Sequence, residues 1–584
     1  MILVFGGTTE GRIAAKVLEE SGATYYYSTR GREQDISLVH GVRLSGAMEV
    51  PDMLKCCHEH GIRLIVDAAH PFAVDLHHNL LDVASQAKIP VIRYDRIYPV
   101  RDEAFVWCKD YDDAIHQLEE HGTERLLALS GVNTIEKLRG YWENHECWFR
   151  ILNREQSHRL AEQSGFPEDH LVYYKQDDTK SLLQELQPQA IITKESGLSG
   201  GFVEKTEAAR QAGVKVFVVQ RPEYPVCPDA MVEHVNGPHG LRRMVEQLLP
   251  EFYPLHSGLT TGTCATAAAI AATRRLMSGE TPDQVPVILP DGETIHVPVT
   301  YGDDYASVCK VAGDDPDVTN GIEVRASVEP SDEFEILGGE GVGTFTFPGF
   351  DYPPGEPAIN KAPRQMMRDN IRENVRITIS VPQGEEIARR TFNPRLGIEG
   401  GISIIGVSGI VKPFSEEAFI SSIRKCVQVA KASGTDRLVI NSGGKSEKFV
   451  KALYPDLPPQ AFVEYGNYIG ETLAIASELD IKNVTMGVML GKAVKLAAGN
   501  LDTHSRRATM DKEFIGAMLR EAGCNIDLSD LTLARELWDR IPAEKLQAFA
   551  RTVINHCAKH CNPLLPNGHL TILLIDDSGE IYSM

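Results

Sequence analysis

Glycines and hydroxyls follow the first apolar run of the sequence in a pattern suited to binding an anion. The segment "GGTTEGR" places Gly6, Gly7 and Gly11 around Thr8 and Thr9, directly after "ILVF". Glycines allow a tight turn there, and amide groups at the start of the next helix attract negative charge. The spacing is not GxGxxG, so two alternatives stay open: a nucleotide site and a plain tight turn.

Further candidate residues in the first half lie at the ends of expected strands. His70 stands in "DAAHPFA", Lys194 and Ser196 stand in "TKESG", and Arg30 follows the second expected strand in "STRG". Open α/β sheets bind ligands outside the carboxyl ends of their strands. We therefore expect a shared cleft, against the alternative of a structural histidine and solvated basic side chains.

Two glycine- and threonine-rich segments in the second half are candidates for binding a cofactor. In "TTGTCATAAA", Thr260, Thr261 and Gly262 precede an alanine-rich helix, where they would cap the helix or hold a carboxylate. In "GGEGVGTFTFPG", Gly341 lies at the centre of a GxGxG spacing. The alternating "TFTF" that follows predicts a strand, so we expect a glycine-rich hairpin and not a Rossmann-type S-adenosylmethionine loop.

The stretch "KVAGDDPDVTNG" concentrates acidic oxygens in one loop. Calcium loops need a glycine at their sixth position and a glutamate at their twelfth, but counting from Asp315 these positions hold Asn320 and Ala326. Calcium is therefore excluded. A solvated acidic turn remains one alternative, and contact of Asp314 or Asp315 with a cationic cofactor is the other.

Basic residues cluster in two segments of this acidic chain. Arg364, Arg368, Arg372 and Arg376 recur every four residues, which predicts one face of a helix. Such a row would bind a polycarboxylate or form a solvated stripe. The second segment, "GKAVKLAAGNLDTHSRRA", supplies three further candidates: Lys492, His504 and Arg506.

The pattern of apolar runs divides the chain into two halves. Residues 1–250 alternate short apolar runs with amphipathic segments, which predicts two Rossmann-like, doubly wound parallel lobes meeting near residues 100–125. Prolines in "LLPEFYPLHSG" predict a boundary, with a linker at 251–256. Residues 257–584 predict an α+β domain.

Composition excludes several classes of protein. The 584 residues carry a net charge of −22, which argues against a general nucleic-acid binder. The eleven cysteines form no repeated CxxC pairs, which indicates a reducing compartment. The first residues predict a buried strand, not a signal peptide, and no apolar run is long enough to span a bilayer. We expect a soluble cytoplasmic protein that binds no membrane.

Residues 1–250 resemble the precorrin-6A reductase family. The likeness rests on "GGTTEGR", "DAAHPFA", "SGV", "TKESG" and "RPEYP". It implies the reduction of one double bond of a corrin precursor, with NADH or NADPH as the hydride source. The residues leave the choice of nicotinamide and the proton donor open.

Residues 257–584 resemble the cobalt-precorrin-5B (C(1))-methyltransferase family. The likeness rests on "TTGTCA", "AGDDPDVTNG", "GEGVGTFT", "PGEPAIN", "FNPRLGI", "GGISI" and "KLAAGNLDTHS". It implies methyl transfer from S-adenosylmethionine, in a fold that is not of the Rossmann type. Cobalt would belong to the substrate, so no metal ligand of the protein is expected.

Together the two resemblances imply a bifunctional enzyme of anaerobic cobalamin synthesis. It would methylate cobalt-precorrin-5B and reduce the resulting cobalt-precorrin-6A to cobalt-precorrin-6B. Two alternatives remain: a nucleotide-sugar oxidoreductase fused to an unrelated domain, and a non-catalytic corrinoid carrier or sensor. The candidate cofactor-binding residues are Gly6, Gly7, Thr8, Thr9, Gly11, Arg30, His70, Lys194, Ser196, Thr260, Thr261, Gly262, Asp314, Asp315 and Gly341. The candidate substrate-binding residues are Arg364, Arg368, Lys492, His504 and Arg506.

Overall fold

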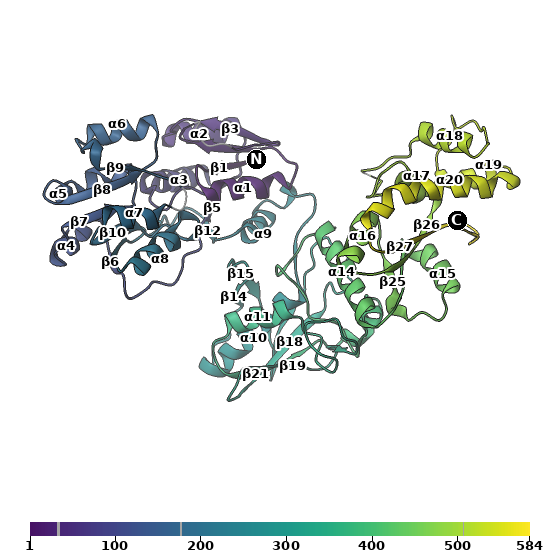
Figure 1. The fold of residues 1–584 in the computed structure, drawn as a ribbon. Coiled ribbons are helices and arrows are strands. Elements are labelled where there is room, and N and C mark those ends of the chain that lie inside the picture. Colours follow the sequence, from purple (N-terminus) through teal and green to yellow (C-terminus); the bar gives the residue numbers. More distant parts are fainter. Residues whose placement is uncertain (32–35, 176–177, 506) are drawn as a thin grey trace. The chain divides into compact units, whose positions relative to one another are not determined.

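The chain forms two compact units. The computed structural model describes residues 1–31, 36–175, 178–505 and 507–584. Unit 1 comprises Met1–His256 together with Asp291–Ile295, and unit 2 comprises Ser257–Pro290 together with His296–Met584. Figure 1 draws unit 1 mainly in purple and blue, and unit 2 from teal to yellow. Each unit is described by itself below.

Unit 1 contains two six-stranded sheets in which all neighbouring strands are parallel. The first sheet has the order β12 (Val232–Val235), β5 (Val91–Tyr94), β4 (Leu64–Asp67), β1 (Ile2–Phe5), β2 (Tyr25–Thr29), β3 (Gly41–Ser45). The second has the order β6 (Val106–Cys108), β11 (Lys215–Val219), β10 (Ala190–Lys194), β7 (Arg125–Ala128), β8 (Glu146–Ile151), β9 (Leu171–Tyr173). The predicted pair of parallel α/β lobes is confirmed.

Only the first sheet of unit 1 takes an edge strand from beyond the other lobe. The second sheet consists of the consecutive strands β6 to β11, and β6 forms one of its edges by pairing with β11. Strand β12 follows the second lobe but pairs with β5 in the first sheet. The chain therefore crosses between the lobes twice, before β6 and before β12.

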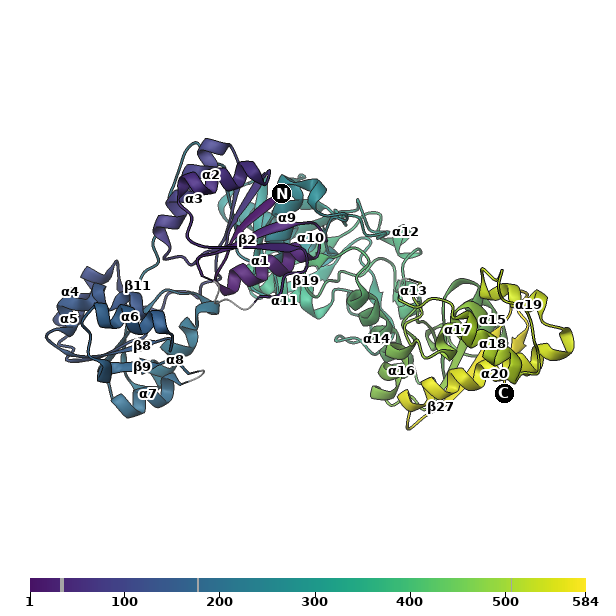
Figure 2. The same cartoon turned by 90° about the horizontal axis from the view of Figure 1, so that it is seen from above.

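Helices cover both faces of each sheet, which explains why the strands are apolar on both sides. In the first lobe Ile2 and Val4 pack with α1 and α9, and Leu3 packs with α2 and α3 on the opposite face (Figure 2). In the second lobe α4 to α6 cover one face, and α7 and α8 cover the other. The helices of unit 1 are α1 (Thr9–Glu19), α2 (Val50–Glu59), α3 (Val74–Ala87), α4 (Tyr111–Glu120), α5 (Arg139–Trp142), α6 (Glu155–Gln163), α7 (Thr179–Leu186), α8 (Phe202–Ala212) and α9 (Pro238–Leu248).

The first part of unit 2 is built around the helix α10 (Thr261–Ser278), which packs on a mixed five-stranded sheet. Residues 261–273 of this helix are buried, because alanine and threonine side chains let the strands approach closely. The sheet order is β16 (Thr300–Tyr301), β17 (Ala306–Cys309), β18 (Glu323–Pro330), β21 (Val375–Ser380), β19 (Glu335–Gly338). Three two-stranded pairs complete this part: β13 (Gly258–Leu259) with β23 (Ile410–Val411), β14 (Gln284–Ile288) with β15 (Thr294–Pro298), and β20 (Thr344–Phe345) with β22 (Ile398–Glu399).

The predicted glycine-rich hairpin is wrong. A strand does follow the glycines, as "TFTF" predicts, but β19 pairs with β21 while β20 pairs with β22. The glycine turn therefore connects two different sheets. Its sharp path is possible because Gly341 adopts a φ of 71°.

The predicted row of four arginines on one helix is also wrong. Helix α11 (Lys361–Asn370) holds Arg364 and Arg368 but ends before Arg372. Arg376 lies in β21, where it forms an ion pair with Glu335. The β-branched run "VRITIS" pairs with β18 and β19, and this tertiary pairing overrides the four-residue spacing.

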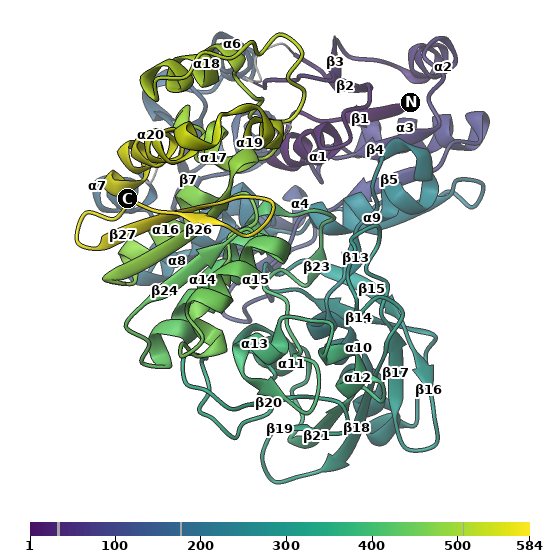
Figure 3. The ribbon, with the colours of Figure 1, turned by 90° about the vertical axis from the view of Figure 1, so that its right-hand side faces the viewer.

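The second part of unit 2 is a parallel sheet with one antiparallel edge strand, which the sequence analysis did not predict. Its order is β25 (Phe462–Glu464), β24 (Leu438–Asn441), β26 (Asn483–Met489), β27 (His569–Ile575), β28 (Ile581–Tyr582). Most helices pack on one face, with α15 on the other (Figure 3). The remaining helices of unit 2 are α12 (Gly384–Ala388), α13 (Asn393–Leu396), α14 (Glu416–Ala432), α15 (Gly444–Leu453), α16 (Ile469–Glu478), α17 (Leu490–Ala497), α18 (Lys512–Glu521), α19 (Leu537–Arg540) and α20 (Ala543–Cys561).

Within the described ranges, no helix combines the length and the apolar character needed to cross a bilayer.

Candidate functional site

A cavity of about 370 Å³ in unit 1 collects many of the predicted residues of the first half. Predicted residues that line it are Gly7, Thr8, Thr9, His70, Lys194 and Ser196. Lining residues that the sequence analysis missed are Arg12, Arg96, Leu129, Ser130, Thr193, Gly200 and Lys205. The lining set, drawn from both lobes, contains no Asp or Glu among the described residues. Four Arg and Lys side chains without a lining carboxylate suit the cavity to an anionic ligand.

The glycine-rich turn is shaped by the ring of Tyr27 beneath it. A Cβ atom at Gly6 would lie 2.2 Å from the Tyr27 hydroxyl oxygen, and one at Gly11 would lie 2.7 Å from it. The Gly7 amide donates a hydrogen bond to the same hydroxyl at 3.3 Å. Thr8 caps α1 by accepting from the Gly11 amide, and its hydroxyl donates to the Ala68 carbonyl. Gly6 and Gly11 therefore support the turn by close packing, while Gly7, Thr8 and Thr9 reach the cavity.

His70 is held at the cavity by a buried polar network. The fully buried Asp67, at the end of β4, contacts His77 Nδ1 at 2.6 Å and accepts a hydrogen bond from the Tyr224 hydroxyl at 3.0 Å. The other ring nitrogen of His77 lies 3.1 Å from the His70 carbonyl oxygen. His70 Nδ1 accepts from the Phe72 amide, so the neutral ring carries its proton on Nε2. Burial, together with neighbouring cations, lowers the pKa of His70 to about 3.

Two lysines of the cavity are held in a partly desolvated state. Burial, with a contribution from Lys137, lowers the pKa of Lys194 to about 8. Burial and nearby Arg150 lower the pKa of Lys205 to about 8. Lys194 lies over the Phe72 ring, and Lys205 donates to the Gly200 carbonyl. An anion entering here would stabilise the charged form of both lysines.

A buried ion pair at the cavity connects the two lobes. Arg96, in the first crossover, contacts the Glu10 carboxylate of α1 at 2.9 Å and donates to the Ser196 carbonyl at 2.6 Å. The Ser199 hydroxyl donates to the same carboxylate. Both charged side chains are less than a tenth exposed. Glu10 and Arg96 therefore fix the lobe containing the glycine-rich turn against the loop containing Ser196.

Arg30 is not brought into the cavity. It is exposed directly after β2 and does not belong to the lining set. Its role in binding stays a prediction.

The threonines at the start of α10 hold a neighbouring loop in unit 2. Thr261 accepts a hydrogen bond from the Ile405 amide at 2.9 Å, and the Thr263 hydroxyl donates to the Gly409 carbonyl at 2.6 Å. Thr260 caps the helix by accepting from the Thr263 amide. At Gly262 a Cβ atom would meet Pro363 at 2.8 Å. These contacts account for the segment structurally, and cofactor binding by Thr260, Thr261 and Gly262 stays a prediction.

The acidic loop 310–321 is organised around Asp317, which the sequence analysis passed over. Asp317 pairs at 2.7 Å with Lys310, whose side chain is only 1% exposed. Asp315 accepts a hydrogen bond from the Phe414 amide at 3.0 Å, and Asp314 lies beside it in the same turn. The loop therefore contacts residues that follow β23.

Gly341 occupies a point where three backbone segments meet. A Cβ atom there would lie 1.8 Å from the Val381 carbonyl oxygen. Cβ atoms at Gly384 and Gly401 would lie 2.0 and 2.1 Å from the Gly341 carbonyl oxygen. Close packing of the chain therefore explains this glycine without a ligand.

The predicted substrate-binding residues of unit 2 that the structure describes lie in α11, in α17 and in the loop after α17. Arg364 pairs with Glu356 at 3.2 Å and stacks on Tyr352, while Arg368 stacks on Phe334. Lys492, at the start of α17, donates to the Gly466 carbonyl, and burial lowers its pKa. The His504 amide donates to Asp502. Arg506 lies outside the described residues, and the role of all five stays a prediction.

One group in the described part of the chain has the composition of a metal site, namely His239, Asp291 and Glu293. The Glu293 carboxylate already accepts hydrogen bonds from the amides of His239 and Gly240 at the start of α9. Burial raises the pKa of this carboxyl to about 7. We interpret the group as a helix cap.

Three family models match different parts of the chain. Residues 250–413 match the family CbiD, residues 502–584 match "CbiD, C-terminal domain", and residues 1–238 match "Precorrin-6x reductase CbiJ/CobK". The cobalt-precorrin-5B C(1)-methyltransferase of Prosthecochloris aestuarii is 43% identical over 345 residues, covering 55% of this chain and 94% of that protein. A relative of the same name from a Geobacillus strain is 40% identical, and the match covers 52% of this chain and 88% of that protein. The chain belongs to the cobalt-precorrin-5B C(1)-methyltransferase family and carries a reductase-family region before it.

Two solved structures are similar to separate parts of the chain. The cobalamin biosynthesis protein CbiD from Archaeoglobus fulgidus is 29% identical, covers 47% of this chain and 86% of its own, and has a TM-score of 0.26. The CobK precorrin-6A reductase is 19% identical, and the match covers 42% of this chain and 97% of that protein, with a TM-score of 0.36. Both resemblances drawn from the sequence are confirmed: the chain joins a methyltransferase and a reductase family of cobalamin biosynthesis.

Proposed function

We propose that the chain catalyses two consecutive steps of corrin-ring synthesis. Residues 257–584 would methylate cobalt-precorrin-5B at ring carbon 1, using S-adenosylmethionine, to give cobalt-precorrin-6A. Residues 1–250 would reduce that product to cobalt-precorrin-6B with NADH or NADPH. Tethering two successive enzymes raises the local concentration of the shared intermediate.

The basic cavity of unit 1 is the observation that carries the reductase proposal. It lies where the carboxyl ends of two parallel sheets meet, which is the usual position of a ligand in such folds. Thr193 Oγ1 is buried there with no hydrogen-bond partner among the described residues, so a polar group of a ligand would satisfy it. A nicotinamide dinucleotide fits this lining through its phosphates, and when bound it supplies the hydride.

The residues of the cavity have distinct roles in this proposal. The turn at Gly7 allows a phosphate to approach the backbone closely, and Lys194, Lys205 and Arg12 attract negative charge. His70 remains neutral and offers an Nε2 proton as a hydrogen-bond donor. Holding hydride donor and acceptor in one cavity lowers the barrier by orientation.

The methyltransferase proposal rests on membership of the family. Methyl transfer is an in-line displacement at a sulfonium, so the protein mainly aligns donor and acceptor. We propose that the site is not of the Rossmann glycine-loop type at Gly341, because a strand follows that turn. We also propose that Asp314 or Asp315 contacts the donor or fixes its loop, and the Asp315 contact with Phe414 favours the second alternative.

A mass measurement tests both activities on the full chain. Cobalt-precorrin-5B, S-adenosylmethionine and reduced nicotinamide are incubated with the protein, and the product should gain one methyl group and then two hydrogens. Lys194→Met with Lys205→Met should stop the reaction after methylation, while Lys180→Met, an exposed change on α7, should not.

The alternatives predict other outcomes of the same assay. A nucleotide-sugar oxidoreductase would leave the tetrapyrrole unchanged and oxidise reduced nicotinamide only with sugars. A corrinoid carrier would bind the tetrapyrrole without changing its mass. Either result would contradict the proposed pair of activities.

A further inference from the structure

The parallel sheet in the second part of unit 2 has the topology of a nucleotide-binding fold. In chain order its parallel strands are β24, β25, β26 and β27, and in space β24 lies between β25 and β26. The chain therefore moves to one side of β24 first and then to the other. Such sheets bind ligands outside the carboxyl ends of the strands, at the place where the order reverses.

The first strand-to-helix turn of this sheet is rich in glycine. The sequence "NSGGKS" connects β24 to α15, and Gly443 and Gly444 adopt φ values of 83° and 51°. The Gly443 amide donates to Asn441 Oδ1 at 2.8 Å, and the Ser442 amide donates to the Ser446 hydroxyl at 3.0 Å. This turn keeps its backbone next to the strand ends.

A carboxylate lies directly over that turn. Glu464 ends β25, the strand adjacent to β24, and a Cβ atom at Gly443 would lie 2.4 Å from its Oε1. In mononucleotide-binding halves, an acidic residue about 20 positions after the glycine turn, at the end of the adjacent strand, binds ribose hydroxyls. Glu464 occupies that place relative to Gly443.

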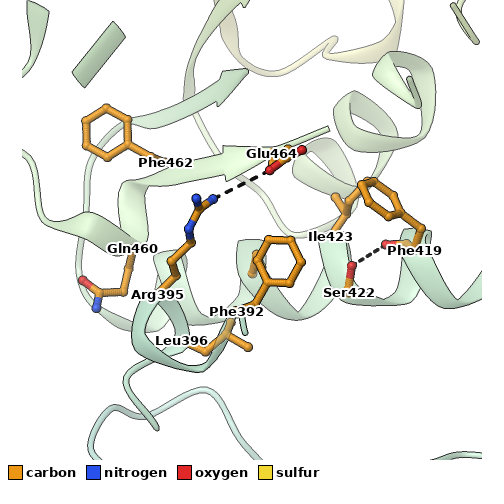
Figure 4. Close-up of a pocket in the computed structure, with 10 residues that line it drawn as sticks. Phe392, Arg395, Leu396, Phe419, Ser422, Ile423, Gln460, Phe462 and Glu464 are labelled. Carbon is orange, nitrogen blue, oxygen red and sulfur yellow. Dashed lines mark hydrogen bonds and ion pairs between the residues drawn. The ribbon is translucent and has the colours of Figure 1, made fainter. Parts of the chain in front are cut away.

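An apolar cavity adjoins the carboxylate. Figure 4 shows Arg395 pointing toward Glu464, with the rings of Phe392 and Phe462 on either side. Arg395 lies 3.8 Å from Glu464 and 3.0 Å from Glu447, so its tighter pair is with Glu447. The cavity measures about 10 Å³, so a nucleoside would enter by displacing Phe392, whose side chain is 41% exposed.

We propose that Glu464 and the Gly443–Gly444 turn bind the adenosine of the methyl donor S-adenosylmethionine through its ribose hydroxyls. This inference rests on the proposed methyltransferase function, and it locates the donor site at the β24–β25 edge of unit 2. The aromatic rings beside Glu464 suit the adenine base, and the carboxylate accepts from both hydroxyls. Glu464 is thus a binding residue that the sequence analysis did not select.

Calorimetric titration of the full chain with S-adenosylmethionine tests the inference. Glu464→Gln keeps the side-chain shape but removes the charge, and it should weaken binding by about 10- to 100-fold. The matched control is Glu478→Gln at the end of α16, which breaks an exposed pair with Arg424 of α14 and should bind like the wild type. Excess NADPH should not displace the donor.

An analogue of S-adenosylmethionine that lacks one ribose hydroxyl distinguishes the loss of a ribose contact from misfolding of the variant. The wild type should bind the 2′-deoxyribose analogue of S-adenosylmethionine more weakly than the parent, whereas Glu464→Gln should bind the two nearly equally. Wild-type affinity in Glu464→Gln would overturn this site but leave the methyltransferase proposal standing, since methylation would continue. A wild-type chain that neither binds the donor nor methylates would overturn both.

Discussion

The guanidinium groups of Arg101 and Arg221 meet on one carboxylate, that of Glu195. Arg101 lies in the first crossover of unit 1 and donates two hydrogen bonds to Glu195, at 3.0 and 3.2 Å. Arg221 lies in the second crossover and donates through its amide and its side chain, at 3.0 and 3.2 Å. Glu195 is only 4% exposed and directly follows the cavity residue Lys194. One buried side chain therefore ties both crossovers to the cavity.

Replacing Glu195 should loosen both crossovers at once. Glu195→Ala removes charge-assisted hydrogen bonds, and we expect unfolding of unit 1 to become easier by about 2–3 kcal/mol. The two arginines are partly exposed and become hydrated, which limits the loss. Urea denaturation followed by near-ultraviolet circular dichroism measures the change. Glu204→Ala, an exposed change on α8, is the control, and an equal effect of both would contradict the role of Glu195.

Ligand binding in the unit 1 cavity should weaken as the pH rises through about 8. Lys194 and Lys205 have pKa values of about 8, so they are charged below this pH and lose their charge above it. Losing one charged contact should cost about tenfold in affinity for NADPH. His70, with a pKa of about 3, stays neutral throughout this range.

Fluorescence titration of the full chain with NADPH between pH 6.5 and 9.5 checks this expectation. Lys194→Arg combined with Lys205→Arg should make the affinity nearly independent of pH, because arginine stays charged. A wild-type profile that is flat across pH 8 would show that these lysines do not face the ligand.

The Lys310–Asp317 pair should make unit 2 sensitive to acid. Lys310 holds the pKa of Asp317 below its usual value despite partial burial. The stability that the ionised Asp317 contributes is therefore complete above about pH 4, the pKa of an aspartate in the unfolded chain. It is lost as the pH falls through the lower pKa that Asp317 has in the folded chain. At pH 7, Asp317→Asn leaves Lys310 buried without its partner and should cost about 3–5 kcal/mol.

Two further variants check the origin of that loss. Asp315→Asn removes only the contact with the Phe414 amide and should cost about 1 kcal/mol. Lys310→Met combined with Asp317→Asn should recover much of the stability, because no buried charge remains. Chemical denaturation at pH 7 and pH 3 measures each effect, and equal losses for the two single variants would refute the explanation.

A side chain at Gly341 should disrupt the junction of three backbone segments. Gly341→Ala would place a methyl group 1.8 Å from the Val381 carbonyl oxygen, and we expect a loss above about 4 kcal/mol in unit 2. Gly355→Ala is the matched control, since Gly355 also has a positive φ but has open space around it. The control should cost about 1–2 kcal/mol from backbone strain alone. Thermal unfolding compares the two, and similar midpoints would contradict the packing argument.

The parallel lobes of unit 1 could be predicted because each strand is a short apolar run between helical segments. "ILVF" and "LIVD" are buried on both faces, and this local signal does not depend on strand order. The return of β12 to the first sheet could not be predicted, because its pairing with β5 depends on contacts far apart in the chain. Likewise, the arginine spacing in 364–376 gave no sign that β21 would begin at Val375.

Some of the residues that line the cavity could be predicted because their signals are also local in the sequence. Glycine-rich turns and polar residues at strand ends mark Gly7, His70 and Lys194 locally. Arg96 lies in a crossover, and its partner Glu10 lies in α1, so only the folded chain brings them together. Two signals were available and not used: Arg12 is adjacent to the glycine-rich turn, and Lys205 follows "TKESG" by a short interval.

The return of β12 has a consequence for how unit 1 can be divided. The second lobe, from β6 to β11, is contiguous in the sequence, whereas the first lobe takes β12 and α9 from beyond it. A cut between β5 and β6 would leave the first sheet without β12, and the edge of β5 would then be exposed to other chains. The second lobe is therefore an insertion within the first, and the first lobe can be transplanted alone only by joining two separate pieces of sequence.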